Sequence, residues 1–502
     1  MSNLSNEQSN LENSLEINVE IIKKILGNPA DLIIRESSIG IIENKFVMIY
    51  LKGIVNEDQV NNNILRILEL NKKEPKTSMF DTVYEEMIAL TEIKKSKNIN
   101  QIIKALLEGD TAVLLNECNQ AILLGTSGGE FRSIEEPQSE SVIRGSRSGF
   151  VESLKFNLAL IRREVKDPNL RINTMKIGKQ SNQNIAICHI EGRAKPEIVD
   201  EVVRRLKTME IDFAPDSGFI EQWIEDSNLS PFPQILDTER PDRVAYNLTK
   251  GKICIIVEGS PFALLMPITI GDSLKSIEDY NQRWLISTLL RLLRFVSFYM
   301  TLFLPALYVA LVSYHPELIP TQLLFTIASS RESVPFPSLI EALIIALFYE
   351  ILQEAGTRLP SKIGQTIGIV GGIVIGEIAV QAGIVTPLMV IAISLTAISA
   401  FTLPNYSLSI GLRVIRFGAI FAATMLGLYG IILVFIMIHI HLANLKSIGI
   451  PYSAPFAPNY LWDLKNVIIR APITTLVKRQ PQPFLEPDED KEQKNNGGKG
   501  KP

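Results

Sequence analysis

Long apolar segments lie together between Arg294 and Lys446, and the sequence on either side of them is polar. Hydrophobic residues make up 46% of the 502 residues and charged residues 21%, and this segregation lets both fractions be high. Segments of this length and composition can cross a bilayer as helices, which satisfy their own backbone polar groups in lipid. The candidates are residues 295–312, 368–385, 387–403 and 417–440. The sequence therefore predicts an α-helical, polytopic membrane domain over residues 283–440.

The way this domain threads the bilayer is only partly determined by the sequence. Residues 318–355 are apolar but interrupted by Pro335 and Pro337, so we expect a broken or re-entrant segment. Residues 284–294 are amphipathic and carry Arg291 and Arg294, which predicts an interfacial helix on the cytoplasmic side. No single set of crossings places every basic loop and the basic tail inside. The number of crossings and the side of the tail stay open.

Glycines recur at every fourth position before and within the second span, so a helix there carries them as one stripe. They are Gly364, Gly368, Gly372 and Gly376. In water each interior glycine costs about 1 kcal/mol relative to alanine. In a bilayer a stripe of small residues lets another helix approach closely, which is a main source of helix association. The stripe is therefore predicted to be a helix-packing surface.

Acidic residues within or beside the apolar segments are candidates for pore lining or gating. Glu377 lies in the glycine-striped segment with Gln381 one turn later, and ionisable groups in membrane helices are costly and often functional. A carboxylic acid kept neutral or paired in a bundle interface is the alternative. Burial predicts a raised pKa for Glu377. Glu350 and Glu354 share one helix face, whereas Glu341 faces away from them.

Two readings of the Glu350 and Glu354 pair stay open. In a symmetric ring they would form two acidic tiers near a pore mouth, and such tiers favour cations. Alternatively, the two acids pair with Arg358, which follows Glu354 by four residues.

The polar N-terminal half carries one order of elements twice. Strands at 31–35 and 45–51 precede Gly53, an amphipathic helix, and a hairpin formed by 109–115 and 120–124. A strand at 184–190 precedes Gly192, another helix, and a hairpin formed by 251–257 and 262–266. We expect two related α/β subdomains, 28–135 and 148–270, joined by a polar linker at 136–147. Chance similarity of βα units is the alternative.

The ends of the chain are polar. Residues 1–27 form a disordered, variable extension apart from a helix expected at 15–26, and no signal peptide is recognisable, so we expect a cytoplasmic N-terminal half. Residues 441–480 are interpreted as a tail, and residues 481–502 are expected to be disordered.

Other motifs favour structural interpretations. The cysteines at 118, 188 and 254 are expected to be buried free thiols, and the glycines at 125–130 lack the lysine of a phosphate loop. His439 and His441 point to different helix faces with no third ligand nearby, so we expect interfacial histidines rather than a metal site. A solvated helix face is the simplest interpretation of five acids in the polar half, namely Asp212, Asp216, Glu221, Glu225 and Asp226. We expect no enzyme activity, cofactor or metal, and the net charge of −4 argues against nucleic acid.

Several segments resemble the GerA family of spore germination proteins. They are the sequences 135–145, 149–150 and 160–163 in the polar half, 335–342, 350–360, 363–365 and 381–385 in the apolar half, and 462–465 and 470–472 in the tail. The resemblance spans about residues 30–480. It implies the A subunit of a germinant receptor in the inner membrane of the endospore, with a two-part cytoplasmic domain. It also implies a transporter-like B subunit and a lipoprotein C subunit as partners.

The resemblance further implies a homo-oligomer, a pentamer in the family, that acts as a nutrient-gated channel for monovalent cations. A scaffold that transmits the signal while another subunit conducts is the alternative, as is a stand-alone ion-release amplifier of the same family. A secondary transporter would need repeats within the membrane half, where the sequence has none. The nutrient, the ion and the subunit count are not readable from the residues.

Overall fold

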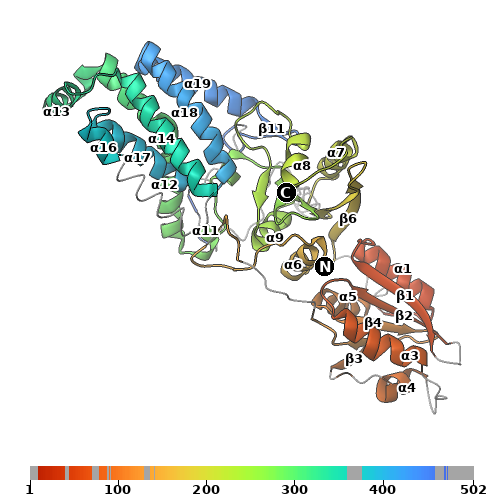
Figure 1. The fold of residues 1–502 in the computed structure, drawn as a ribbon. Coiled ribbons are helices and arrows are strands. Elements are labelled where there is room, and N and C mark those ends of the chain that lie inside the picture. The colour runs from red at the N-terminus through yellow and green to blue at the C-terminus, as the bar shows by residue number, and fades with distance from the viewer. Residues whose placement is uncertain are drawn as a thin grey trace, which may run out of the picture. The chain divides into compact units, whose positions relative to one another are not determined.

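The computed structural model describes residues 10–39, 44–70, 79–87, 90, 92–128, 136–140, 142–358, 376–457, 469–470 and 472 (Figure 1). The chain divides into two compact units. The first, called the α/β unit, comprises Met1–Glu225 and Asp237–Pro267, together with the C-terminal Pro481–Pro502. The second, called the helical unit, comprises Asp226–Leu236 and Ile268–Gln480.

The α/β unit contains two five-stranded sheets, and the lobe around each sheet is called lobe 1 or lobe 2. The strand order in lobe 1 is β1-β2-β4-β5-β3, and every neighbouring pair is antiparallel. The strands are β1 (Leu32–Ile39), β2 (Asn44–Leu51), β3 (Ile93–Ser96), β4 (Thr111–Leu115) and β5 (Ala121–Leu124). The edge strand β3 was not predicted, because its sequence IKKS is short and its two lysines are exposed.

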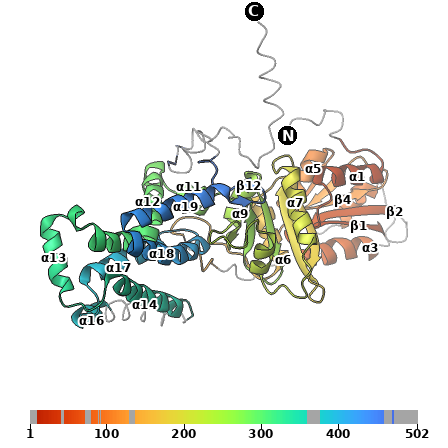
Figure 2. The ribbon, with the colours of Figure 1, turned by 90° about the horizontal axis from the view of Figure 1, so that it is seen from above.

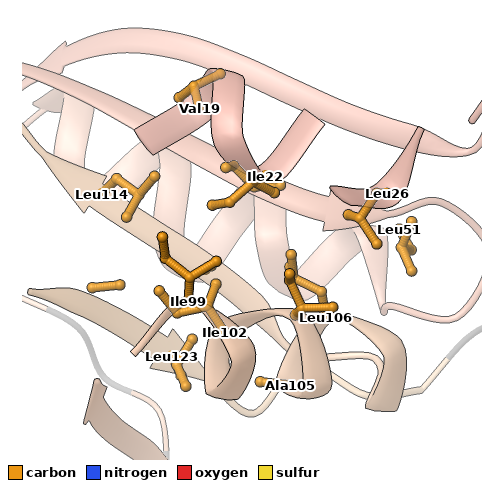
Figure 3. Packing of buried hydrophobic residues seen from close by; sticks show 14 of the residues in the cluster. Val19, Ile22, Leu26, Leu51, Ile99, Ile102, Ala105, Leu106, Leu114 and Leu123 are labelled. Carbon is orange, nitrogen blue, oxygen red and sulfur yellow. The ribbon is translucent and has the colours of Figure 1, made fainter. Parts of the chain in front are cut away.

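Helices cover both faces of the lobe 1 sheet. Side chains alternate along a strand, so Val47 and Ile49 of β2 face one helical layer while Phe46 and Met48 face the other. The first layer is α1 (Leu15–Leu26) and α5 (Ile99–Glu108), whose side chains meet between helix and sheet (Figure 3). The second layer is α2 (Glu57–Gln59), η2 (Val60–Leu65), α3 (Arg66–Leu70), α4 (Met79–Thr82) and η3 (Val83–Met87). Double coverage explains the nearly continuous apolar sequence of β2.

Helix α1 corrects the predicted start of lobe 1. Residues 1–27 were placed outside the lobe, and the helix at 15–26 was treated as part of a variable extension. In the structure Val19, Ile22 and Leu26 pack into the lobe 1 core, and Ile22 is fully buried (Figure 3). The helix ends at Gly27, whose φ of 71° closes it in the left-handed conformation that glycine adopts easily.

Lobe 2 repeats the topology of lobe 1, as the sequence pattern predicts. Its strand order is β6-β7-β9-β10-β8, which matches β1-β2-β4-β5-β3 position by position. The strands are β6 (Leu170–Ile177), β7 (Gln183–Ile190), β8 (Leu236–Thr238), β9 (Ile253–Val257) and β10 (Ala263–Met266). The helices are α6 (Leu154–Glu164), α7 (Pro196–Lys207), α8 (Ser217–Ile224) and α9 (Pro241–Thr249). Gly53 and Gly192, which occupy matching positions, have φ values of 96° and 71°.

The helical unit includes two short helices before its long ones, α10 (Ile270–Ser273) and α11 (Glu278–Asn281). Its longer helices are α12 (Trp284–Tyr314), α13 (Thr321–Arg331), α14 (Ser338–Arg358), α17 (Pro387–Phe401), α18 (Tyr406–Leu426) and α19 (Leu428–Asn444). Shorter elements are η4 (Pro316–Leu318), α16 (Gly376–Gln381) and the hairpin of β11 (Lys446–Ser447) and β12 (Ile450–Pro451). Among the described residues, α12 and α18 are long and apolar enough to cross a membrane, and α17 and α19 are shorter apolar helices.

Three predicted boundaries in this unit were wrong, two of them at the first two spans and the third within the span 417–440. The expected interfacial helix at 284–294 is continuous with the first span, and together they form the 31-residue α12. The described end of the second span, α16, stops at Gln381 rather than at residue 385, because the chain turns at Gly383, whose φ is 66°. Residues 368–375 of that span lie outside the described part.

The predicted span 417–440 is broken at Gly427, which separates α18 from α19. The two helices lie side by side (Figures 1 and 2). Gly430 allows this close packing, since a Cβ added there would lie 2.1 Å from the carbonyl oxygen of Ala422. An apolar run of this length can therefore form a tight helical hairpin where a glycine ends one helix and a second glycine permits backbone contact.

Candidate functional site

Glu350 on α14 forms ion pairs with two arginines of α18. Arg413 Nη1 donates to Glu350 Oε2 at 3.2 Å, and Arg416 Nη2 donates to Glu350 Oε1. The Arg416 side chain is fully buried, whereas 24% of the Glu350 side chain is exposed. The described partners of Glu350 therefore lie on α18. The side chain of Arg358 lies outside the described part, so the pairing of the two acids with Arg358 stays a prediction. Glu354, one turn later, is exposed, so the two acids do not share one environment.

Aromatic rings surround these arginines. The guanidinium carbon of Arg416 lies 5.7 Å from the ring centroid of Tyr349 and 5.6 Å from that of Phe417. The guanidinium carbon of Arg413 lies 5.8 Å from the ring of Tyr406. A cation near an aromatic face recovers part of the free energy that it loses on leaving water.

Glu341, also on α14, is fully buried in a network that joins several helices. The backbone N–H of Thr386 donates to Glu341 Oε1 at 2.7 Å, and the Thr386 hydroxyl donates to the same oxygen. Arg331 of α13 lies 3.3 Å from Glu341 Oε2. The hydroxyls of Tyr308 and Thr386 are 3.0 Å apart, and Tyr308 is the donor because Thr386 gives its proton to Glu341. Glu341 therefore ties α13 and α14 to the N-terminus of α17.

Glu377 and Gln381 occupy one face of α16, as their spacing predicts. Gln381 Nε2 donates to Glu377 Oε1 at 3.0 Å. Both side chains are exposed in this chain, so the expected burial of Glu377 was wrong for the single subunit. Gly376 faces α17, where an added Cβ would make an ordinary 3.6 Å contact with Val390 Cγ1. The other three stripe glycines, Gly364, Gly368 and Gly372, lie outside the described residues.

Sequence reasoning missed the role of Asp279. Arg291 Nε donates to Asp279 Oδ2 at 2.9 Å, and Arg294 Nη1 lies 2.8 Å from both carboxylate oxygens. All three side chains are almost fully buried, so the two arginines, which were expected on an interfacial helix, are paired with a buried carboxylate. The sequence did contain a signal for this role. Two arginines one turn apart on an apolar helix need a counter-charge, and Asp279 lies shortly before that helix.

Arg470 of the C-terminal tail is held at the same junction. Its guanidinium donates to the carbonyl oxygens of Gln282, at 2.9 Å, and Tyr280, at 3.1 Å. Its backbone N–H donates to Thr288 Oγ1 at 3.2 Å, and its side chain is buried. The tail motif therefore closes over the start of α12. The tail residues 462–465 lie outside the described part.

In the α/β unit the expected linker is bound to lobe 2. Glu140 accepts hydrogen bonds from Thr238 Oγ1 at 3.0 Å and from Arg243 Nη1 at 2.9 Å. Glu239 accepts from the backbone N–H of Gln138 at 2.6 Å. Burial raises the pKa of the Glu140 carboxyl, and the charge of Arg243 opposes that shift. The segment 136–140 is thus part of the folded lobe rather than a free connection.

Glu221 on α8 is another exception to the expectation of a solvated helix face. Burial raises the pKa of its carboxyl to about 8, and the negative charges of Asp237, Glu225 and Asp216 act in the same direction. The sequence does not show this burial, and Asp237 belongs to β8, a strand that the sequence analysis did not find.

No group of three or more His, Cys, Asp or Glu side chains that could hold a metal ion occurs among the described residues. His439 Nδ1 lies 2.8 Å from the carbonyl oxygen of Phe435, and its Nε2 lies 3.2 Å from the hydroxyl of Tyr299. His441 Nε2 lies 2.8 Å from Ser230 Oγ. Two of the three free cysteines, Cys188 and Cys254, are buried, and Cys118 is half-buried.

Comparison with known proteins identifies the family. The Bacillus/Clostridium GerA spore germination protein family matches residues 20–482. The chain belongs to the GerA family. It is 45% identical over 466 residues to spore germination protein GerLA of Bacillus cereus, covering 92% of this chain and 94% of that protein. It is 38% identical over 474 residues to the membrane protein YfkQ of Bacillus subtilis (strain 168), covering 94% of this chain and 92% of that protein.

A solved structure is also similar to this GerA-family chain. The N-terminal domain of the A subunit of the Bacillus megaterium spore germinant receptor GerK3 is 30% identical, with a TM-score of 0.38. The match covers 52% of this chain and 96% of that domain.

The segments that resemble the GerA family coincide with polar contacts in the structure. Hydrogen bonds of Glu140 hold the segment 136–140 against lobe 2, and hydrogen bonds of Glu341 join α14 to α17. Glu350 pairs with α18, and Arg470 closes the tail over α12. These motif residues make tertiary contacts within one chain. Gln381, on the exposed face of α16, differs from them.

Proposed function

We propose that this GerA-family chain is the A subunit of a germinant receptor in the inner membrane of the endospore, and that copies of it form a nutrient-gated cation channel. The relatives support a role in spore germination through their names, since they include spore germination proteins GerLA of Bacillus cereus and KA of Bacillus subtilis (strain 168). The proposed partners are further copies of the chain, as in a pentamer, and the B and C receptor subunits.

Placement in a membrane with several crossings is supported by the surface of the helical unit. Large apolar side chains are exposed along its helices, where water would be an unfavourable neighbour. They include Leu285, Leu289, Phe325, Ile398, Phe401, Val414, Met425 and Met437. Exposure of such residues on α12 and α18, the two helices long enough to span, fits lipid contact. The α/β unit would then lie in the cytoplasm.

The observation that carries the channel proposal is the exposed pair of Glu377 and Gln381 on α16. A carboxylate and an amide on the surface of an apolar helical unit are costly if they face lipid. They are favourable if they face water in a pore or polar groups of a neighbouring copy. In a symmetric ring the carboxylates of Glu377 would come from every copy, and a ring of acids attracts cations.

Glu350 is assigned a different role in this proposal. Its carboxylate is paired with two arginines and carries no free negative charge toward a pore. Glu341 is likewise used within the chain, so both serve to hold helices together. Of the four candidate acids, Glu354 and Glu377 are the two whose side chains are exposed, and the proposal assigns conduction to them.

Conductance in planar bilayers tests the proposal. The purified full-length chain is inserted alone and then with the B and C subunits, and currents are recorded in asymmetric salt with and without nutrients. The proposal predicts cation-selective steps that appear in the complex when nutrient is present. A chain that conducts alone and ignores nutrients would be a stand-alone amplifier. Absence of conductance in a complex that still binds nutrient would make the chain a signal-transmitting scaffold.

A further inference from the structure

The cluster around Arg416 contains more positive than negative charge. Arg413 and Arg416 of α18 contribute two cations, and Glu350 of α14, to which both are bonded, contributes one anion. Arg416 is fully buried and 12% of the Arg413 side chain is exposed. A net positive charge within an apolar helical unit is unfavourable unless another anion compensates it.

Several hydrogen-bond donors of this cluster have no partner among the residues that the structure describes. They are Nε and Nη1 of Arg416, Nε of Arg413 and the hydroxyl of Tyr349, all buried. The aromatic rings of Tyr349 and Phe417 attract the charge of Arg416, but they supply no oxygen lone pair to its N–H groups. Each buried donor without an acceptor costs about 1 to 3 kcal/mol, so an acceptor group in this cluster would be strongly favoured.

We propose that Arg413, Arg416 and Tyr349 form a binding site for a phosphate-class oxyanion. The two guanidinium groups offer N–H donors at Nε and Nη1 of Arg416 and at Nε of Arg413, and several donors suit an anion with several equivalent oxygens. The hydroxyl of Tyr349 adds a neutral donor from a second helix. The partly exposed side chains of Arg413 and Glu350 mark the side from which the anion enters. The site does not depend on whether the chain conducts ions.

Glu350 acts as an internal competitor in this site. Its carboxylate occupies one donor of each arginine, so it lowers the affinity for an external anion and holds the helices together when none is bound. Replacement of Glu350 by Gln should therefore strengthen anion binding, whereas loss of an arginine should weaken it. A cluster with a purely structural role would not respond in these opposite directions.

Anion titration of the detergent-purified full-length chain tests the site. Inorganic phosphate is added at constant ionic strength, and the apparent Kd is taken from the shift in the thermal unfolding midpoint. Arg416→Gln should raise the Kd about tenfold or more, because it removes charge-assisted hydrogen bonds. Glu350→Gln should lower the Kd by a similar factor. Arg331→Gln is the matched control, because it removes the arginine that pairs with Glu341 in the same unit. It should leave the Kd for phosphate unchanged.

A second arm identifies the source of the phosphate group. Phosphatidic acid replaces inorganic phosphate in mixed micelles, and native mass spectrometry counts lipid retained after detergent washing. Stabilisation and retention of lipid by the wild type but not by Arg416→Gln would assign the site to a lipid headgroup. Stabilisation by inorganic phosphate alone would assign it to a free anion. If Arg416→Gln does not fold, Tyr349→Phe replaces it as the variant that lacks a hydrogen-bond donor. Its Kd for the anion should rise by about twofold to tenfold. Equal affinities in the wild type, Glu350→Gln and the donor variants would overturn the proposal.

Discussion

Asp31 and Arg162 form a buried, two-point ion pair between the lobes of the α/β unit. Arg162 Nε donates to Asp31 Oδ2 at 2.7 Å and Nη2 donates to Oδ1 at 3.0 Å. Asp31 precedes β1 of lobe 1, whereas Arg162 lies on α6 of lobe 2. Ala159, also on α6, packs into the core of lobe 1. Helix α6, which contains the GerA-like segment 160–163, thus belongs to the packing of both lobes.

The first prediction concerns this ion pair. Asp31→Asn leaves the Arg162 guanidinium buried without its counter-charge, so the free energy of unfolding of fragment 10–267 should fall by about 3 to 5 kcal/mol. Urea unfolding followed by circular dichroism measures it. Glu136→Gln is the control, since Glu136 pairs with Arg147 in an exposed position and should change stability by less than about 0.5 kcal/mol. Equal effects of the two substitutions would contradict a buried link between the lobes.

The second prediction concerns pH and Glu221. The carboxyl of Glu221 titrates near pH 8 in the folded chain and near its ordinary 4.5 when unfolded. Between these values the unfolded chain releases a proton that the folded chain keeps, so stability falls as pH rises and levels off above pH 8. Glu221→Gln removes the titrating carboxyl and with it this loss of stability between the two pH values. Urea unfolding at pH 5 and pH 8 should show that the variant loses less stability than the wild type, by about 1 kcal/mol or more. Parallel losses would mean that Glu221 is solvated.

The repeated fold of the α/β unit was predictable, and particular residues show why. Strands such as β2 and β9 are strongly apolar, and the glycines after β2 and β7 mark the same turn in both lobes. The edge strands β3 and β8 were missed because they are short and polar. Helix α1 was assigned to an extension, because its amphipathic pattern does not reveal which sheet buries it.

The charged contacts of the helical unit were not predictable from spacing. Spacing placed Gln381 beside Glu377, because both lie on one helix. It offered Arg358 as one possible partner of Glu350 and did not reveal Arg413 and Arg416, which lie far along the chain on α18. Such pairings depend on which helices become neighbours, and helical periodicity carries no information on that point.

The third prediction uses two glycines of the α18 and α19 hairpin. Gly430→Ala places a Cβ against the backbone of Ala422 and should lower stability by about 1 to 3 kcal/mol, because backbone cannot move aside as a side chain can. Gly418→Ala is the matched control, since an added Cβ there meets nothing within 4 Å and the substitution favours the helix. Thermal unfolding of the detergent-purified chain compares them. A lower midpoint for Gly418→Ala than for Gly430→Ala would contradict the close packing.

The fourth prediction concerns assembly along the glycine stripe. Gly372→Leu should prevent close helix contact, so the oligomer and the germination response should be lost while the α/β unit stays folded. Gly376→Ala is the control at the described end of the stripe, where a Cβ has room beside Val390. Chemical crosslinking in membranes and germination assays on spores measure both effects. Normal assembly of Gly372→Leu would remove the stripe as an interface.

The last prediction separates the acids that could conduct from those that hold helices. Glu377→Gln removes an exposed charge from every copy in a ring, so cation-over-anion selectivity should weaken and the reversal potential in asymmetric salt should move toward zero. Added salt should reduce the difference between variant and wild type, because it screens exposed charges. Glu332→Gln, at an exposed acid that ends α13, serves as the control and should leave the reversal potential unchanged. Glu354→Gln tests the second exposed acid and should act in the same direction as Glu377→Gln. A reversal potential that is the same in Glu377→Gln, Glu354→Gln and the wild type would place both acids outside the conduction path and leave them as contacts between copies.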